Sequence, residues 1–165
     1  MRKFELTTDT KMRFGKKLFR IKALIDFGNV KEGEKGGYIE KEENLSQSGN
    51  AWVSGNAEVY GNAKVYGNAE VYGNAWVSGN AWVSGDAWVS GNADYATASG
   101  FGSEYRTTTF FRLKNSDEIG VRCGCFYGTL KEFKEKVKET HGETKKAKEY
   151  LMLADLMEYR FSEEK

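Results

Sequence analysis

A unit of six residues recurs eight times along the middle of this chain, and it limits the available folds more than any other feature of the sequence. Each copy opens with Gly-[Asn/Asp]-Ala, and in all but the last a variable residue and a valine follow. A period of six matches the two-residue alternation of a β-strand and does not match the 3.6 residues of a helical turn. The repeat therefore predicts short strands that place alanine and valine on one face and the variable residue on the other. The copies begin at Gly49, Gly55, Gly61, Gly67, Gly73, Gly79, Gly85 and Gly91.

The Gly-Asn pair of each unit predicts a corner in the chain, because glycine adopts positive φ readily and asparagine is the next most tolerant residue. Three corners would close a triangular coil of three units, or 18 residues. Such a coil resembles the left-handed parallel β-helix of hexapeptide-repeat proteins, which implies an interior filled by one aliphatic and one small residue per unit. We expect the valines from Val53 to Val89 and the alanines from Ala51 to Ala93 to form these interior series, with the asparagines stacked as ladders.

The segments before the repeat are predicted to cover the open end of the stack, where backbone groups would otherwise lack partners. Residues 1–48 are expected to form an N-terminal β cap with one or two imperfect first coils, because Ile39 and Leu45 fall in the alanine register of the repeat. Residues 49–97 are expected to form the regular β-helix. The cap strand is expected to turn one apolar face inward, formed by Phe19, Ile21, Ala23, Ile25 and Phe27.

Residues 98–165 are predicted to form a separate ββαα domain. The segments TTTFFRLK and IGVRCGCF indicate two strands joined by the turn NSDE. Thr129 is expected to open a helix with Glu132 as its capping-box partner, and Gly142 occupies the position of a C-terminal cap. A second helix over Thr144–Phe161 has an apolar face too wide for one small sheet, which favours its coverage by a partner chain.

The chain is therefore predicted to be mainly β, a left-handed parallel β-helix with an N-terminal β cap and a C-terminal ββαα cap domain, assembled as a homotrimer. Four tryptophans occupy variable positions and are expected to point outward, where large aromatics usually mark a contact surface. One explanation is self-association, since hexapeptide β-helices pack as parallel trimers. The other is a ligand or partner site lined by tryptophan. The expected interface residues are Trp52, Trp76, Trp82, Trp88 and Tyr72.

Charge and hydropathy argue against several classes of partner. The 25 basic residues nearly balance the 24 acidic ones, so no overall field favours nucleic acid or an anionic membrane. The sequence lacks an apolar run long enough to span a membrane and an apolar secretory signal. Its two cysteines lie two positions apart and cannot join distant segments, so we expect a reducing, cytoplasmic location.

The segment GFGSEYRTTT is the most site-like part of the chain, because it lies at the junction of the repeat and the C-terminal domain, where concave pockets tend to form. Its glycines and serine can form a backbone nest, and its arginine and threonines offer donors suited to phosphate or carboxylate. A small anion is the predicted ligand, and a purely structural junction loop is the alternative. The candidate ligand-binding residues are Phe101, Gly102, Ser103, Arg106, Thr107 and Thr108.

The sequence gives little support for other chemistry. His141 is the only histidine and falls at the end of a predicted helix, where an imidazolium suits the helix dipole; ligand contact and a general-base role are the alternatives. Cys123 and Cys125 share a strand face and are interpreted as small core residues. Two thiols and one imidazole fall short of the four ligands of structural zinc, so no metal, cofactor or catalytic residue is predicted.

Two longer segments, RIKALIDFGNVKEGEKGGYIEKEENLSQSGNAWVSGNA and VRCGCFYGTLKEFKEKVKETHG, resemble hexapeptide-repeat proteins encoded by phages and prophages. Small phage proteins often bind and disable host factors, so the resemblance implies a non-enzymatic binding protein in the cytoplasm of an infected or lysogenic bacterium. We expect it to sequester a small anionic, nucleotide-like host molecule at subunit junctions and so to counter host defence.

Two other functions remain open. One is a protein-binding inhibitor of a host defence factor, which would use the tryptophan faces or the helical cap. The other is a degenerate acyltransferase, because the chain also resembles hexapeptide-repeat acyltransferases, although in its β-helix alone. Those enzymes use a catalytic histidine on a loop near a coil. Here no histidine precedes His141 and no inserted loop interrupts the repeat, so the acyltransferase is the least favoured function.

Overall fold

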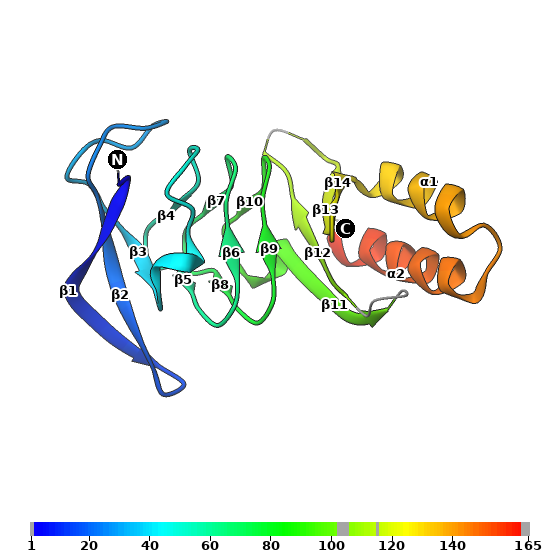
Figure 1. Cartoon of the computed structure of the whole chain (residues 1–165), viewed down its shortest axis with the longest axis horizontal. Coiled ribbons are helices and arrows are strands. Elements are labelled where there is room, and N and C mark those ends of the chain that lie inside the picture. Colours follow the sequence, from blue (N-terminus) through cyan, green and yellow to red (C-terminus); the bar gives the residue numbers. More distant parts are fainter. Residues whose placement is uncertain (1, 102–105, 115, 163–165) are drawn as a thin grey trace. The chain divides into compact units, whose positions relative to one another are not determined.

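The computed structural model describes residues 2–101, 106–114 and 116–162 (Figure 1). The chain divides into two compact units, Met1–Asn92 and Ala93–Lys165. The described residues form mainly strands, with two α-helices in the second unit, which confirms the prediction of a mainly β protein. Neither of these described helices is both long enough and apolar enough to cross a membrane.

The first unit is built on seven strands of two residues each, one for each valine of the repeat. Each coil pairs in parallel with the next: Trp52 pairs with Glu70, and Glu70 with Trp88, a step of 18 residues each time. β4, β7 and β10 form one sheet, β5 and β8 belong to a second and β6 and β9 form a third (Figure 1). The chain therefore advances by one coil for every three repeat units. The strands are β4 (Trp52–Val53), β5 (Glu58–Val59), β6 (Lys64–Val65), β7 (Glu70–Val71), β8 (Trp76–Val77), β9 (Trp82–Val83) and β10 (Trp88–Val89).

The interior of the coils is filled by the two apolar series of the repeat. The valines from Val53 to Val89 are at most 1% exposed, and so are the alanines from Ala51 to Ala87. Ala93, which was expected to continue the alanine series, is exposed because it lies after the last coil in a short 3₁₀ turn, η2 (Asn92–Asp94). The prediction of a valine and alanine interior is otherwise confirmed.

The corners need glycine both for backbone conformation and for space. Gly67 has a φ of +69°, and a Cβ at this position would lie 2.9 Å from the backbone nitrogen of Gly85 in the next coil. Any side chain would therefore push adjacent coils apart. Beside the corners, the Asn62 side-chain amide donates to Oδ1 of Asn80 at 3.4 Å, which is one rung of an expected asparagine ladder.

A long antiparallel hairpin, β1 (Phe4–Arg13) and β2 (Lys16–Ala23), forms the N-terminal end of the first unit. β2 also pairs with β3 (Lys35–Ile39), and β3 pairs in parallel with β5, so the hairpin and the coils share one sheet of order β1-β2-β3-β5-β8. A short 3₁₀ turn, η1 (Glu42–Asn44), follows β3. The strand of the expected apolar cap face ends at Ala23, where Ile21 and Ala23 are fully buried; Phe19, Ile25 and Phe27 are half-buried.

The first coil differs from the sequence prediction in its register. Ile39 pairs with Val59 and Leu45 bridges to Val65, so both residues lie in the valine register and not in the alanine register. Their partners stand 20 residues away instead of 18, because the chain contains two extra residues between Leu45 and Val53.

The segment with the extra residues contacts the N-terminal strand. Oε1 of Gln47 accepts hydrogen bonds from the backbone N–H groups of Lys3 and Phe4, at 2.7 and 3.2 Å. The Lys3 ammonium, which is 1% exposed, donates to the carbonyl of Ala51 at 2.7 Å, and burial lowers the pKa of Lys3 to about 8. Polar contacts over more than 40 positions of sequence thus fix this end of the stack, and the hexapeptide pattern does not encode them.

The second unit is a four-stranded antiparallel sheet with two helices, whereas the sequence predicted two strands and two helices. The strands missing from the prediction are β11, which consists largely of small and polar residues, and β14, which has only four residues. The sheet order is β11-β12-β13-β14. The elements are β11 (Tyr95–Phe101), β12 (Arg106–Arg112), β13 (Ile119–Cys123), β14 (Phe126–Thr129), α1 (Leu130–His141) and α2 (Lys145–Phe161).

The helix ends lie where the sequence places them. The Thr129 side chain accepts from the backbone N–H of Glu132, and the Glu132 carboxylate accepts from the N–H of Thr129, which completes the predicted capping box. Gly142 ends α1 with a φ of +58°, and the Thr144 side chain caps the N-terminus of α2.

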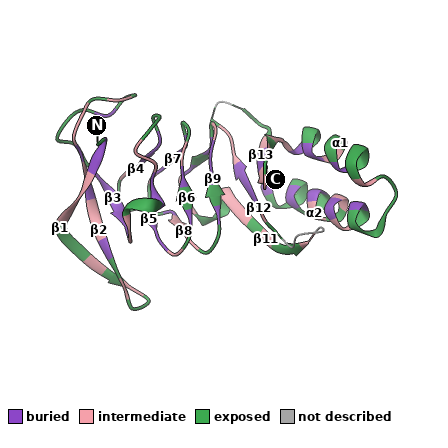
Figure 2. Cartoon of the chain, in the orientation of Figure 1, coloured by how far each residue is buried: buried purple, intermediate pink, exposed green. Residues whose placement is uncertain are grey.

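One face of each helix packs on the sheet, while the other side is exposed (Figure 2). The helix α2 has more apolar residues than this core covers: Met152, Leu156 and Tyr159 are 71%, 54% and 81% exposed. The face is as wide as the sequence indicates, and the described chain covers only its inner part. The buried core consists of Phe110, Val121, Leu130, Phe133, Val137, Ala147, Tyr150, Ala154, Met157 and Phe161.

Candidate functional site

The four tryptophans of the first unit differ in exposure, although all occupy the same position of the repeat. Trp52 is only 5% exposed because Phe4 and Phe27 of its own chain pack edge-on against it, with ring centroids at 6.5 and 5.2 Å. Its Nε1 is buried and has no hydrogen-bond partner among the residues that the structure describes. Trp52 was expected to face a partner chain, but the N-terminal segment of its own chain covers it.

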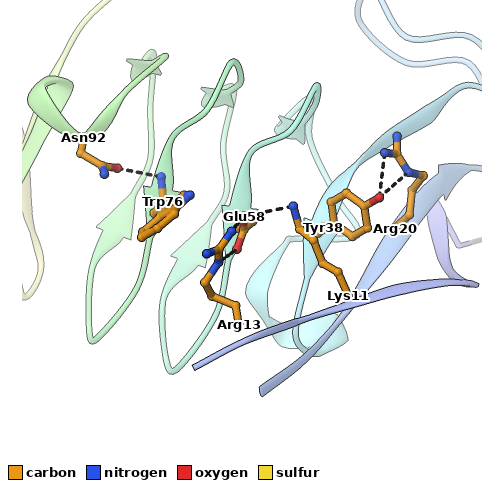
Figure 3. Close-up of polar contacts among 7 residues, drawn as sticks. All are labelled: Lys11, Arg13, Arg20, Tyr38, Glu58, Trp76 and Asn92. Atoms are coloured by element: carbon orange, nitrogen blue, oxygen red, sulfur yellow. Dashed lines mark hydrogen bonds and ion pairs between the residues drawn. The ribbon is translucent and has the colours of Figure 1, made fainter. Parts of the chain in front are cut away.

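Trp76 lies beneath the hairpin, which is clamped to the coils through Glu58 (Figure 3). Arg13 donates two hydrogen bonds to the Glu58 carboxylate, at 2.7 and 2.9 Å, and the Lys11 ammonium lies 3.0 Å from it. The Arg13 guanidinium also lies over the Trp76 ring, 4.2 Å from its centroid, and Phe14 meets that ring edge-on at 5.9 Å. This sheet face is therefore occupied by the chain's own hairpin.

The Glu58 carboxyl group is 1% exposed and depends on its two cationic partners. Burial alone would raise its pKa, but the hydrogen bonds and charges of Arg13 and Lys11 outweigh burial and hold the pKa of Glu58 below its usual value. A buried carboxylate with this set of partners has a structural role, because it joins the hairpin to the coil.

Trp82 and Trp88 are the most exposed of the four tryptophans, at 37% and 39%. Tyr66 packs edge-on against Trp82 at 6.3 Å, and Tyr72 lies tilted against Trp88 at 5.6 Å. These pairs lie on two different sheets of the coil, those of β9 and β10. Exposed aromatic surfaces of this kind often mark a contact with another protein.

A cavity of about 300 Å³ lies within the second unit, between its sheet and its helices. β12 contributes Arg106, the end of β13 and the turn that follows it contribute Cys123 and Cys125, and α1 contributes Lys136 and His141. Two of these side chains carry permanent positive charge, and the described lining contains no carboxylate. The remaining described lining residues are Phe126, Phe133, Val137, Thr140 and Tyr150.

The turn between the two cysteines holds Arg106 at the cavity. Gly124 has a φ of +57°, and a Cβ at this position would collide with the Arg106 guanidinium. The guanidinium therefore packs against the backbone between Cys123 and Cys125, where the positive φ favours glycine. The interpretation of both cysteines as small core residues is wrong for Cys125, which is exposed in the turn, whereas Cys123 packs against the core. The C-G-C turn also supports a cationic wall.

The structure describes four of the six predicted ligand-binding residues, and of these four only Arg106 lines the cavity. The Thr107 hydroxyl bonds to Ser99 at 2.8 Å, and the buried Thr108 hydroxyl donates to the Cys123 sulfur at 3.2 Å. The Phe101 carbonyl accepts a hydrogen bond from the Tyr150 hydroxyl at 3.2 Å. Gly102 and Ser103 lie outside the described residues.

Aromatic rings form the inner wall of the cavity. Tyr150 meets Phe133 edge-on at 5.6 Å and stacks with His141 at 6.0 Å, and Phe126 lies 5.7 Å from Phe133. Burial, with a smaller contribution from Cys123, raises the pKa of Tyr150 to about 12, while Arg106 opposes the shift. Tyr150 therefore keeps its proton at neutral pH and serves as a hydrogen-bond donor.

His141 is the last residue of α1, as expected, and it also lines the cavity. Lys136 and Thr140 were missed by the sequence analysis. Their signal is helical spacing, because Phe133, Lys136 and Thr140 follow one another at three or four residues and so share one side of α1.

The described residues contain no group of three or more histidine, cysteine or acidic side chains placed to hold a metal ion. Comparison with known proteins finds no family model that matches the chain and no match among curated proteins.

Proposed function

We propose that this chain is a non-enzymatic binding protein that holds a small anionic, nucleotide-like molecule in the cavity of its second unit. The observation that carries the proposal is a cavity with cations at one wall, aromatic rings at another and no carboxylate in its described lining. Such a lining attracts an anion and accepts a flat ring.

Each wall has a distinct part in this proposal. The Arg106 guanidinium can form a forked contact with a phosphate or carboxylate, and Lys136 supplies a second charge from α1. The rings of Phe133 and Tyr150 offer an edge and a face to a nucleobase. A cavity of about 300 Å³ is at the small end of ligand sites, which favours one nucleotide over a dinucleotide.

The proposal extends to the assembly and its setting. We propose that the coils form a left-handed parallel β-helix and that three copies associate through the surfaces of Trp82 and Trp88, which stay exposed in the single chain. The resemblance to phage-encoded hexapeptide-repeat proteins supports a role in the cytoplasm of a bacterial host, where removal of a signalling nucleotide would blunt a defence response.

The first test is to denature the purified protein and to identify any released small molecule by mass spectrometry, followed by calorimetric titration with nucleoside monophosphates. Arg106→Ala should weaken binding about ten- to a hundredfold, since it removes a charge-assisted hydrogen bond. Arg106→Lys should restore part of the affinity, because an ammonium cannot make the forked contact.

Two lysines of α1 provide a matched control. Lys136→Ala should weaken binding because Lys136 lines the cavity, while Lys131→Ala should not, because Lys131 is exposed outside the described lining. Equal affinities for the two variants and the unchanged protein would contradict the cavity as the site. Turnover of acetyl-coenzyme A would contradict a binding protein and favour the acyltransferase.

An inhibitor that binds a host protein is the second candidate, and the exposed apolar stripe of α2 favours it. Met152, Leu156 and Tyr159 recur at helical spacing and form a surface that another protein can cover. Capture of one host protein that is lost in Leu156→Glu and retained in Arg106→Ala would support this second function over nucleotide binding.

A further inference from the structure

The cavity contains two thiols that nucleotide binding does not use. Cys123 and Cys125 are both free, and they flank the turn at Gly124 so that both line the same space. The two differ in their surroundings. Cys123 is half-buried, packs against the core and accepts the Thr108 hydrogen bond, whereas Cys125 is exposed. A pair of thiols with one accessible and one sheltered member is suited to a two-step exchange reaction.

The charges around these thiols select what can approach them. The Arg106 guanidinium packs on the turn between the cysteines, and Lys136, whose ammonium lies 3.9 Å from the Glu139 carboxylate, lines the same cavity from α1. An anionic molecule is therefore drawn to the thiols, while a cationic one is repelled.

From this arrangement we propose that Cys123 and Cys125 form a thiol–disulfide exchange site for small anionic disulfides, with oxidised glutathione as the representative substrate. The proposal goes beyond nucleotide binding and does not depend on it, although both use the same cations. Cys125 is the attacking residue because it is the accessible one, and Cys123 is the resolving residue because it stands two positions away in the same cavity.

The reaction needs no oxidant other than the disulfide itself. The Cys125 thiolate attacks one sulfur of the substrate, a new S–S bond forms, and the first half of the substrate leaves as a thiolate. The Cys123 thiolate then attacks Sγ of Cys125, which joins the two cysteines and releases the second half as a thiolate. Two protein thiols are oxidised, one substrate disulfide is reduced to two thiols, and the two protons pass to solvent or to the released thiolates.

The test uses three small disulfides of different charge on the full-length protein, in the absence of nucleotide. Oxidised glutathione is anionic, bis(2-hydroxyethyl) disulfide is neutral and cystamine is cationic. Intact-mass spectrometry over time should show an internal disulfide that forms about tenfold faster with oxidised glutathione than with the neutral compound, and slowest with cystamine. Equal rates for the three compounds would overturn the selection by charge.

Variants of the cysteines assign the two steps. Cys123→Ser should stop at a mixed disulfide on Cys125, detected as one added glutathione unit, because the resolving thiol is gone. Cys125→Ser should react much more slowly, because the sheltered thiol must then attack. A mixed disulfide that forms equally fast in both variants, or no internal disulfide in the unchanged protein, would refute the proposed roles.

Charge variants connect the reaction to the cavity. Lys136→Ala should slow the reaction with oxidised glutathione and leave the neutral disulfide unaffected, and Lys131→Ala should change neither rate. Arg106→Ala should act in the same way as Lys136→Ala, with circular dichroism as the check that it folds. If Lys136→Ala and Lys131→Ala behave alike, the cavity does not guide the substrate. The double variant Cys123→Ser/Cys125→Ser separates the two proposals. It lacks the thiols and cannot carry out the exchange reaction, so its affinity for nucleotide tests the binding proposal on its own.

Discussion

Glu58 has a structural role that its position in the repeat does not indicate. Its position in the repeat is that of an outward residue, yet it is 1% exposed because Arg13 and Lys11 of the hairpin close over it (Figure 3). Burial of the carboxylate is unfavourable, but the hydrogen bonds and charges of Arg13 and Lys11, which are themselves partly exposed, outweigh this cost. The clamp therefore joins residues 45 or more positions apart through a buried charge that its partners compensate.

This arrangement predicts how stability depends on pH. The pKa of Glu58 is lower in the folded state than in the unfolded chain, so its contribution is present above the unfolded value, about 4.5, and is lost as pH falls below it. Glu58→Gln should reduce the free energy of unfolding by about 1–3 kcal/mol at pH 7 and by less at pH 3. Urea denaturation at both pH values measures this difference. Glu70→Gln, at the same position of the repeat unit but on another sheet, should have a smaller effect; an equal effect would exclude the clamp as the cause.

At the scale of the elements, the repeat predicts the strands of the regular coils but does not predict the first coil of the stack. Valine and alanine at two-residue spacing can only share a face, so the interior was predictable from a period of six. The 20-residue step at Ile39 was not predictable, because Gln47 bonds across more than 40 positions to the N-terminal strand. β11 escaped prediction because its small, polar residues show little alternation, and only pairing with β12 makes it a strand.

The candidate site, too, was predictable from the sequence only in part. Arg106 was identified from its residue type, since a guanidinium in a glycine-rich segment suits an anion. The rest of the cavity comes from elements far apart in the chain: Lys136 and His141 from α1, Tyr150 from α2 and the cysteines from the end of β13 and the turn that follows it. Only the packing of the helices on the sheet brings these side chains to one space, and no local pattern reports it.

The assignment of inward and outward positions in the coil can be tested by two substitutions. Val71→Asp should abolish folding of the first unit, because Val71 is fully buried between coils and a carboxylate there has no partner. Glu70→Lys, one position away on the outward side, should leave the protein folded with a modest change in thermal stability. Circular dichroism melts compare the two variants. Similar melts would mean that the assigned inward and outward faces are incorrect.

For the whole molecule, two exposed apolar surfaces compete as the contact between copies. One is the pair Trp82 and Trp88 on the coil, and the other is the α2 stripe of Met152, Leu156 and Tyr159. Trp82 and Trp88 lie six residues apart on two different sheets of the coil, so each copy presents an aromatic residue on two faces, which suits a closed, symmetric association. The sheet face at Trp76 is excluded, because the hairpin occupies it.

The expected assembly is a trimer, so light scattering should give about three times the chain mass of 18.6 kDa. The double variant Trp82→Glu/Trp88→Glu should reduce the mass to that of one chain, because charged side chains cannot be buried against the apolar surface of a neighbour. Leu156→Glu should leave the trimer intact if the coil surfaces form the contact. The reverse outcome, dissociation by Leu156→Glu alone, would assign the contact to α2 and leave the tryptophans available for another partner. A single-chain mass for the unchanged protein at micromolar concentration would rule out both surfaces as contacts between copies.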